Sequence, residues 1–81
     1  MEINVLMPAL SPTMVKGNLT KWYKKVGDRV RSGDLLVEIE TEKSVLDYES
    51  PEVGILKSIV VPAGSRDIEV GSIIAVLGMG G

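Results

Sequence analysis

The sequence predicts an all-β fold, and three observations support that prediction. Val and Ile account for 18 of the 81 residues, and their β-branched side chains suit the pleated, half-buried surface of a sheet. Nine Gly and four Pro interrupt the chain at short intervals, as turns between short strands would require. No segment keeps an apolar stripe at helical spacing over three turns, so no helix is expected.

The first two strands are separated by a proline-containing loop. Alternating residues predict a strand over 2–7, which a proline ends. Residues 8–14 contain two prolines and are therefore expected to form a surface loop. The next strand is expected over 17–23, with Leu19 and Trp22 facing the core.

Two further strands complete the first half of the chain. Gly-Asp pairs at 27–28 and 33–34 predict turns on either side of a short strand around Val30. The segment 35–40 alternates clearly. The alternation predicts one face made of Leu35, Val37 and Ile39.

The second half predicts four more strands by the same criteria. A strand over 45–50 is ended by a proline, and turn residues separate the strands that follow it. These are expected at 54–60, around 68–70 and at 73–77.

An internal repeat relates the two halves. The segment 17–19 (Gly-Asn-Leu) recurs at 54–56 (Gly-Ile-Leu), and 26–28 recurs at 63–65, both at an offset of 37 residues. After one inserted residue, 30–36 matches 68–74. The repeat predicts a small barrel or flattened sandwich with approximate two-fold symmetry, in which the turn at 41–44 and the chain termini lie at opposite ends.

Composition excludes several classes of function. The chain has no Cys and no His, so it offers neither a thiolate nucleophile nor the usual neutral-pH base, and we expect no catalytic residue and no metal site. A net charge of −2 and three aromatic residues do not favour nucleic-acid binding. The apolar runs, such as 59–63, are too short to span a membrane. The N-terminus resembles no secretory signal, which predicts a cytosolic protein or the mature form of a delivered one.

Lys43 is the only basic residue in an acidic stretch. The six acids between positions 38 and 52 are Glu38, Glu40, Glu42, Asp47, Glu49 and Glu52. They disfavour a Schiff-base role because carboxylates stabilise the charged ammonium. Two interpretations remain: a solvated turn lysine with weak ion pairs, or an accessible attachment point whose long stem serves as a tether.

The order of the motifs resembles the lipoyl domains of 2-oxo acid dehydrogenase complexes, most closely those of pyruvate dehydrogenase acyltransferases. The matching motifs are Pro-Ala-Leu-Ser-Pro-Thr-Met at 8–14, Gly17-x-Leu19, Trp22, Gly27-Asp28, Gly33-Asp34 and Glu-x-Glu-Thr-Glu-Lys at 38–43. The resemblance covers essentially the whole chain and extends to Gly54-x-Leu56 and Gly71-x-Ile73-Ile74.

The resemblance implies a fold and a function. The fold would be a flattened barrel of two four-stranded antiparallel sheets with a pseudo-two-fold axis, as in lipoyl and biotinyl carriers. The domain would span 1–78, with 79–81 as the start of a linker or of an added tail. The function would be that of a non-catalytic carrier, with lipoic acid joined to Lys43 through an amide and shuttling acyl groups and reducing equivalents between active sites.

The resemblance also implies roles for individual residues. Correct modification of Lys43 would depend on Glu40, Glu42, Ser44, Gly27 and Gly54. Partner recognition would involve Leu10, Glu42, Asp47 and Glu49. The family usually has Asp-Lys-Ala at the tip, whereas this chain has Glu42-Lys43-Ser44. We expect modification to tolerate this difference.

The implied partners belong to one multienzyme complex in a bacterial cytoplasm or a mitochondrial matrix. They are a thiamine-diphosphate-dependent 2-oxo acid decarboxylase, a dihydrolipoyl dehydrogenase, an acyltransferase core and a lipoate-attaching enzyme. One alternative is a biotinyl carrier, although such domains place Met on both sides of the target lysine and this chain does not. The other is an unmodified small β-barrel that serves as an interaction module.

Overall fold

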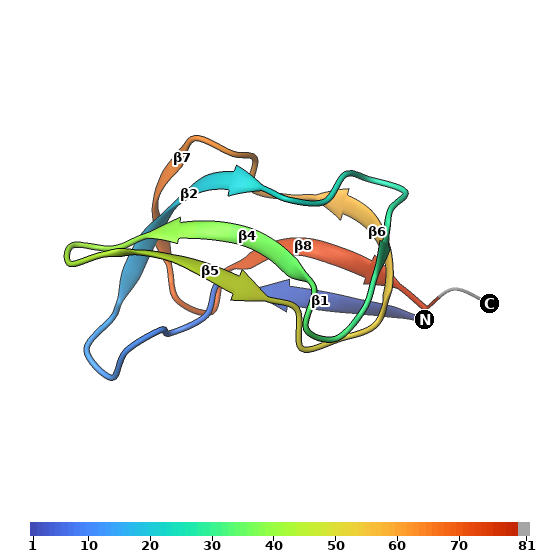
Figure 1. Cartoon of the computed structure of the whole chain (residues 1–81), viewed down its shortest axis with the longest axis horizontal. Helices are drawn as coiled ribbons and strands as arrows, with labels where there is room; N and C mark the ends of the chain where they lie inside the picture. The colour runs from blue at the N-terminus through green and yellow to red at the C-terminus, as the bar shows by residue number, and fades with distance from the viewer. Residues whose placement is uncertain (80–81) are drawn as a thin grey trace.

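Short alternating segments, several of them separated by glycine turns, form eight β-strands in the computed structural model, which describes residues 1–79 (Figure 1). The strands are β1 (Glu2–Leu6), β2 (Lys16–Trp22), β3 (Arg29–Val30), β4 (Leu35–Glu40), β5 (Val45–Glu49), β6 (Gly54–Ile59), β7 (Ser65–Glu69) and β8 (Ile73–Gly78). The described residues contain no helix, and hence none that is long and apolar enough to cross a membrane. The predicted all-β fold is confirmed. Only β7 begins clearly earlier than expected, because its first residues are polar and show no apolar alternation.

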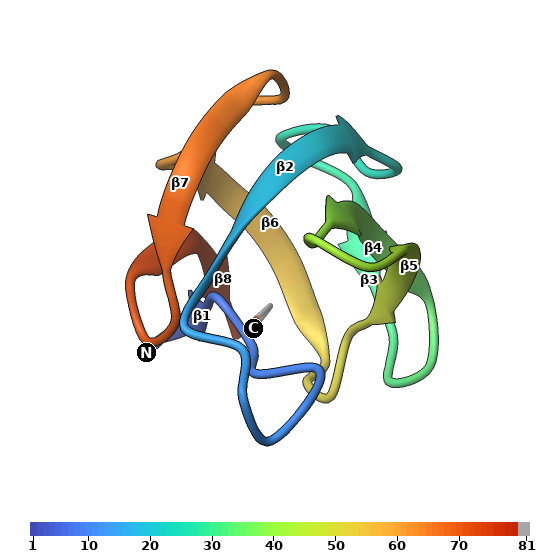
Figure 2. The same cartoon turned by 90° about the vertical axis from the view of Figure 1, so that its left-hand side faces the viewer.

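The strands form two four-stranded antiparallel sheets that enclose the core (Figure 2). The strand order is β1-β8-β6-β3 in one sheet and β5-β4-β2-β7 in the other. The core is made of small aliphatic side chains and one methionine. Its buried residues are Val5, Met7, Leu19, Val30, Leu36, Val37, Ile39, Leu56, Ile74, Ala75 and Leu77. The expected core residue Trp22 is half-buried against this cluster, and its indole N–H donates to the carbonyl of Val61 at 2.9 Å.

The predicted two-fold relation holds at the level of strand register. Leu19 lies opposite Ile39 in the β2–β4 pair, and Leu56 lies opposite Leu77 in the β6–β8 pair. The offsets between these equivalent residues are 37 and 38, as in the sequence repeat. Both pairs also contain a register shift at the same place, so the halves share their irregularities as well as their strands.

A register shift in β4 corrects one expectation about side-chain direction. Leu35, Val37 and Ile39 were expected on one face, but Leu36 and Val37 are both fully buried while Leu35 is 41% exposed. The pairing of β4 with β5 is irregular between Leu35 and Val37, and such a bulge interrupts strict alternation. Ile73, the equivalent of Leu35, is likewise 42% exposed.

Two glycine turns join the two halves of the chain. Gly27 and Gly64 adopt positive φ values of 99° and 89°, a region that other L-residues rarely enter. The N–H of Gly27 donates to the carbonyl of Leu56 at 2.8 Å, and that of Gly64 donates to the carbonyl of Leu19 at 2.7 Å. A turn in each half is therefore hydrogen-bonded to an inner strand from the other half, β6 in the first case and β2 in the second.

The β4–β5 hairpin lies at the opposite end of the elongated body from the N-terminus and the end of β8, as the repeat predicted (Figure 1). The two ends are related by the same symmetry. Thr41 N–H donates to Ser44 O at 2.8 Å across the hairpin, and Met79 N–H donates to Met1 O at 2.9 Å between the termini. The β4–β5 turn thus occupies the position that corresponds, by symmetry, to the pairing of Met79 with Met1.

Candidate functional site

Lys43 lies at the tip of the β4–β5 hairpin, in a turn organised by Thr41. The Thr41 hydroxyl oxygen accepts the N–H groups of Lys43 at 3.3 Å and of Ser44 at 3.2 Å. The same hydroxyl donates to Ser44 O at 3.1 Å. The threonine side chain thereby accepts hydrogen bonds from two backbone N–H groups that would otherwise need a backbone carbonyl or a water molecule as partner. The backbone of Lys43 is fixed while its side chain is exposed.

Replacing Thr41 with Val should loosen this turn. Valine keeps the shape of threonine but loses the oxygen that holds two backbone N–H groups, at a cost of about 1 kcal/mol. We expect faster amide hydrogen exchange at residues 42–44. Thr20→Val is a matched control. The Thr20 hydroxyl donates to the Glu38 carboxylate at 2.8 Å, and this contact lies outside the turn. Equal exchange at 42–44 in both variants would contradict the role given to Thr41.

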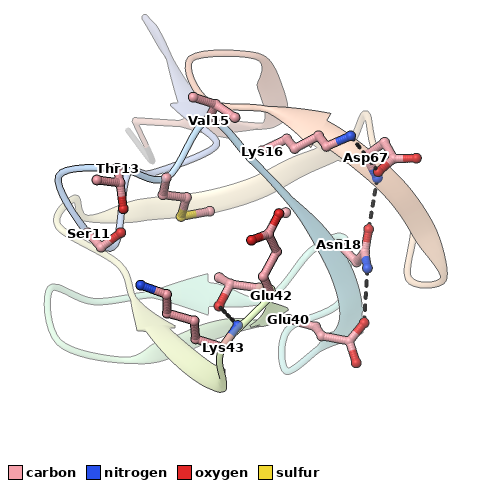
Figure 3. Close-up of a pocket in the computed structure, with 12 residues that line it drawn as sticks. Ser11, Thr13, Val15, Lys16, Asn18, Glu40, Glu42, Lys43 and Asp67 are labelled. Carbon is pink, nitrogen blue, oxygen red and sulfur yellow. Dashed lines mark hydrogen bonds and ion pairs between the residues drawn. The ribbon is translucent and has the colours of Figure 1, made fainter.

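A groove of about 340 Å³ separates the hairpin from the loop between β1 and β2. Its lining combines apolar and polar side chains. The residues are Ser11, Thr13, Met14, Val15, Lys16, Gly17, Asn18, Glu40, Thr41, Glu42, Lys43 and Asp67. The Lys43 side chain extends from the hairpin toward the loop that carries Ser11 (Figure 3).

The structure brings together only part of the predicted acidic cluster. Glu40 and Glu42 line the groove with Lys43. Asp47 and Glu49 lie on β5 and are exposed, outside this lining. Within residues 1–79, the ion pairs are Lys16–Asp67 and Lys24–Asp34, and neither includes Lys43. The Lys43 ammonium is therefore not held in an ion pair by the surrounding acids.

Asp47 binds a tyrosine on the outer face of its sheet. The Tyr23 hydroxyl donates to the Asp47 carboxylate at 2.7 Å. This hydrogen bond is the main reason that the pKa of Tyr23 rises from 10.0 to about 12, because ionisation would remove the donated proton. Lys21 places its ammonium 4.8 Å from the centre of the same ring.

Titration of Tyr23 should reveal this contact. Because its folded-state pKa lies above the unfolded value, Tyr23 adds stability that is present below pH 10 and is lost as the pH rises toward 12. Asp47→Asn should shift the Tyr23 midpoint back toward 10, as measured by ultraviolet absorption of the phenolate. The titration is best done in a Tyr48→Phe background, because burial also raises the pKa of Tyr48. An unchanged midpoint in the Asn variant would refute the contact.

Three other predicted residues lie outside the hairpin. Gly54 is buried at the start of β6, beside Gly78 at the terminus end of the molecule. Gly27 lies in an exposed turn before β3. Leu10 is half-buried against the core, in the loop between β1 and β2. Neither Gly27 nor Gly54 lines the groove beside Lys43, so we expect any effect of these glycines on modification to pass through the stability of the fold.

Sequence reasoning did not identify three residues of this end of the molecule. Thr41 could have been found, since Thr often forms such contacts at the start of a turn. Asn18 and Asp67 could not, because they meet through contacts between residues 49 positions apart. Asn18 also donates to Glu40 at 2.9 Å.

The chain is similar to several known proteins. Residues 3–77 match the biotin/lipoyl family model, described as "Biotin-requiring enzyme". The chain is 52% identical over 81 residues to the dihydrolipoyllysine-residue acetyltransferase component of the pyruvate dehydrogenase complex from Zymomonas mobilis, covering 100% of this chain and 18% of that protein. It is 51% identical over 74 residues to the mitochondrial protein X component of the pyruvate dehydrogenase complex from Chaetomium thermophilum, covering 91% of this chain and 17% of that protein.

The fold is also similar to a solved structure. The lipoyl domain of the 2-oxoglutarate dehydrogenase complex from Azotobacter vinelandii superposes with a TM-score of 0.73 and 28% sequence identity. The match covers 98% of this chain and 99% of that domain. The chain spans less than a fifth of the length of the two curated relatives and nearly all of the solved domain.

Proposed function

Since this chain belongs to the biotin/lipoyl family, we propose that it is a lipoyl carrier domain and that Lys43 is the residue to which lipoic acid is attached. The observation that carries this proposal is the position of Lys43 at the tip of a fixed turn. The lysine is exposed and unpaired among the described residues, at the end of the body far from the termini. A modifying enzyme could reach its amine without disturbing the core.

The surroundings of Lys43 fit a covalently attached lipoyl group. An amide at Nζ would remove the positive charge and change the net charge from −2 to −3, making the hairpin more acidic. The adjacent groove offers Met14 and Val15 as apolar lining for an uncharged arm. The dithiolane would supply the acyl-accepting and redox chemistry that a chain without cysteine lacks, while the protein supplies position and recognition.

Lipoate is favoured over biotin by the residues that flank Lys43. These are Glu42 and Ser44, and neither is the methionine expected beside a biotinylated lysine. The relatives named above are dihydrolipoyllysine-residue proteins or components of the same kind of complex. Avidin blotting after co-expression with a biotin ligase separates the alternatives, and a positive signal at Lys43 would overturn the choice of lipoate.

We propose that the recognition residues act in two ways. Glu40, Glu42 and Ser44 lie in or beside the turn and would contact the attaching enzyme directly. Gly27 and Gly54 would support modification through the fold. Recognition of partner enzymes would use Leu10 in the loop between β1 and β2, Glu42 in the turn, and Asp47 and Glu49 on β5. Charged groups of this kind contribute mainly specificity and encounter rate.

The proposed setting is a pyruvate dehydrogenase complex. The partners would be a thiamine-diphosphate-dependent decarboxylase, a dihydrolipoyl dehydrogenase, an acyltransferase core and a lipoate-attaching enzyme. Tethering the domain to such a core would raise the effective concentration of the arm at each active site. The compartment would be a bacterial cytoplasm or a mitochondrial matrix, and one of the two named relatives is a mitochondrial protein. The limits of 1–78 for the domain and 79–81 for a linker or tail stay a prediction, and residues 80–81 lie outside the described part.

Reductive acylation of the lipoylated domain tests the carrier function. The domain is incubated with pyruvate and the decarboxylase of a pyruvate dehydrogenase complex, or with 2-oxoglutarate and the decarboxylase of a 2-oxoglutarate complex. We expect acyl transfer to the domain in the first reaction, at a rate at least about tenfold above that in the second. The mass of the domain reports the transfer. A lipoylated domain that accepts no acyl group from either enzyme would contradict the carrier function.

A further inference from the structure

We propose that Asn18 is a positioning residue that holds the Glu40 carboxylate in place for the enzyme that modifies Lys43. This inference rests on the proposed function, because it assigns a means of recognition at the same site. Glu40 lies at the end of β4, directly before the turn that carries Lys43. Asn18 lies opposite Glu40 on β2.

Asn18 links two segments through its side-chain amide (Figure 3). Its nitrogen donates to Glu40 Oε1 at 2.9 Å, and its oxygen accepts the backbone N–H of Asp67 at 2.8 Å. The two contacts fix the orientation of the amide, because a backbone N–H cannot accept and a carboxylate cannot donate a proton. The side chain of Glu40 is therefore tied through Asn18 to the backbone of β7.

The pseudo-symmetry shows that the fold does not require this arrangement. At the terminus end, Ile55 occupies the position equivalent to Asn18 and lies opposite Gly78, the equivalent of Glu40. The same strand register thus forms there with an apolar residue opposite a glycine. Among the described residues, the series of hydrogen bonds from Glu40 through Asn18 to Asp67 has no counterpart at Ile55, which points to a role in function rather than in folding.

The conformation of Asp67 supports the same conclusion. β7 contains one residue more than the repeat requires, and Asp67 in this stretch has a φ of 55°. Among the described residues it is the only non-glycine with a positive φ. Asp tolerates this region better than most residues, although the conformation is still unfavourable. The irregular strand places its N–H against Asn18.

A fixed carboxylate would aid recognition by an attaching enzyme. A free glutamate side chain loses rotamer freedom on binding, and this loss weakens association. Asn18 restricts Glu40 beforehand, at the edge of the groove that also contains Lys43. The expected consequence is a lower KM for attachment, since the benefit lies in binding.

A pair of reciprocal variants tests this role in the intact domain. Asn18→Ile copies the residue found at the terminus end, and Ile55→Asn makes the reverse change far from Lys43. Lipoate-attachment kinetics are measured with a lipoate ligase and ATP, together with the melting temperature of each variant. Asn18→Ile should lower kcat/KM about tenfold, mainly through KM, as expected for loss of a charge-assisted hydrogen bond. Ile55→Asn should leave attachment unchanged. Asn18→Ala is a second variant should the isoleucine disturb folding.

A double-mutant cycle distinguishes positioning from general support. If Asn18 acts through Glu40, adding Asn18→Ile to Glu40→Ala should cause no further loss of kcat/KM for attachment. Independent losses in the double variant, equal attachment by wild type and Asn18→Ile, or an equal loss in Ile55→Asn would each overturn the inference while lipoylation of Lys43 stands. A wild-type domain that is not lipoylated at Lys43 would overturn the proposed function and this inference together.

Discussion

Replacing Lys43 with Arg should abolish lipoyl attachment and leave the domain folded. Arginine retains the positive charge, but its guanidinium remains protonated and cannot serve as the acyl-accepting amine. The side chain at position 43 is exposed and makes no ion pair within residues 1–79, so stability should change by less than about 0.5 kcal/mol. Intact mass after co-expression with a lipoate ligase reports attachment, and chemical denaturation reports stability.

Lys25→Arg is the matched control for this substitution. Lys25 is also exposed and lies in a turn, but it is not part of the hairpin or the groove. We expect full attachment in the control and none in Lys43→Arg. Retained attachment in Lys43→Arg would show that another lysine is the acceptor.

Among the substitutions proposed for this chain, Gly54→Ala should cause the largest decrease in the free energy of unfolding. An added Cβ would lie 2.6 Å from the carbonyl oxygen of Gly78 and 3.3 Å from Leu77 Cβ. A backbone carbonyl in a paired strand cannot move aside without distorting the sheet. Overpacking of this kind costs about 3 kcal/mol, a large part of the stability of a small domain. The free energy of unfolding measures the loss, and attachment at Lys43 should decrease only as the unfolded fraction grows.

Gly17→Ala is the control supplied by the symmetry. Gly17 is the equivalent of Gly54, but its added Cβ would face side chains and not backbone, at 2.9 Å from Met7 Cε, 3.0 Å from Met14 Cε and 3.1 Å from Ile39 Cγ2. Methionine side chains adapt more easily than a strand backbone, so the cost should be about 1 kcal/mol. A loss in Gly17→Ala equal to or larger than that in Gly54→Ala would refute this account of the two glycines.

The sequence was sufficient to predict the strands and their symmetry for a physical reason. Local patterns determined them: alternation of apolar residues marks a strand, and Gly27 and Gly64 mark turns because they require a positive φ. The offset between the halves then related the turn at 41–44 to the termini. Lys43 could therefore be placed at the far end before any contact was known.

Other features could not be predicted because they depend on contacts distant in sequence. The bulge in β4 exposes Leu35 and buries Leu36, and nothing in the local alternation signals it. The contact of Asn18 with Asp67 joins residues 49 positions apart, and that with Glu40 joins residues 22 positions apart. The groove beside Lys43 is likewise formed by segments that meet only in the folded chain. The sequence thus indicated the proposed attachment point, while the structure was needed to show what surrounds it.

Localising the modification in the wild-type chain tests the central claim most directly. The domain is co-expressed with a lipoate ligase in the presence of lipoate, digested, and examined by tandem mass spectrometry. We expect a single lipoyl group, on the peptide that contains Lys43. A lipoyl group on any other lysine, or an unmodified Lys43 in a folded domain, would contradict it.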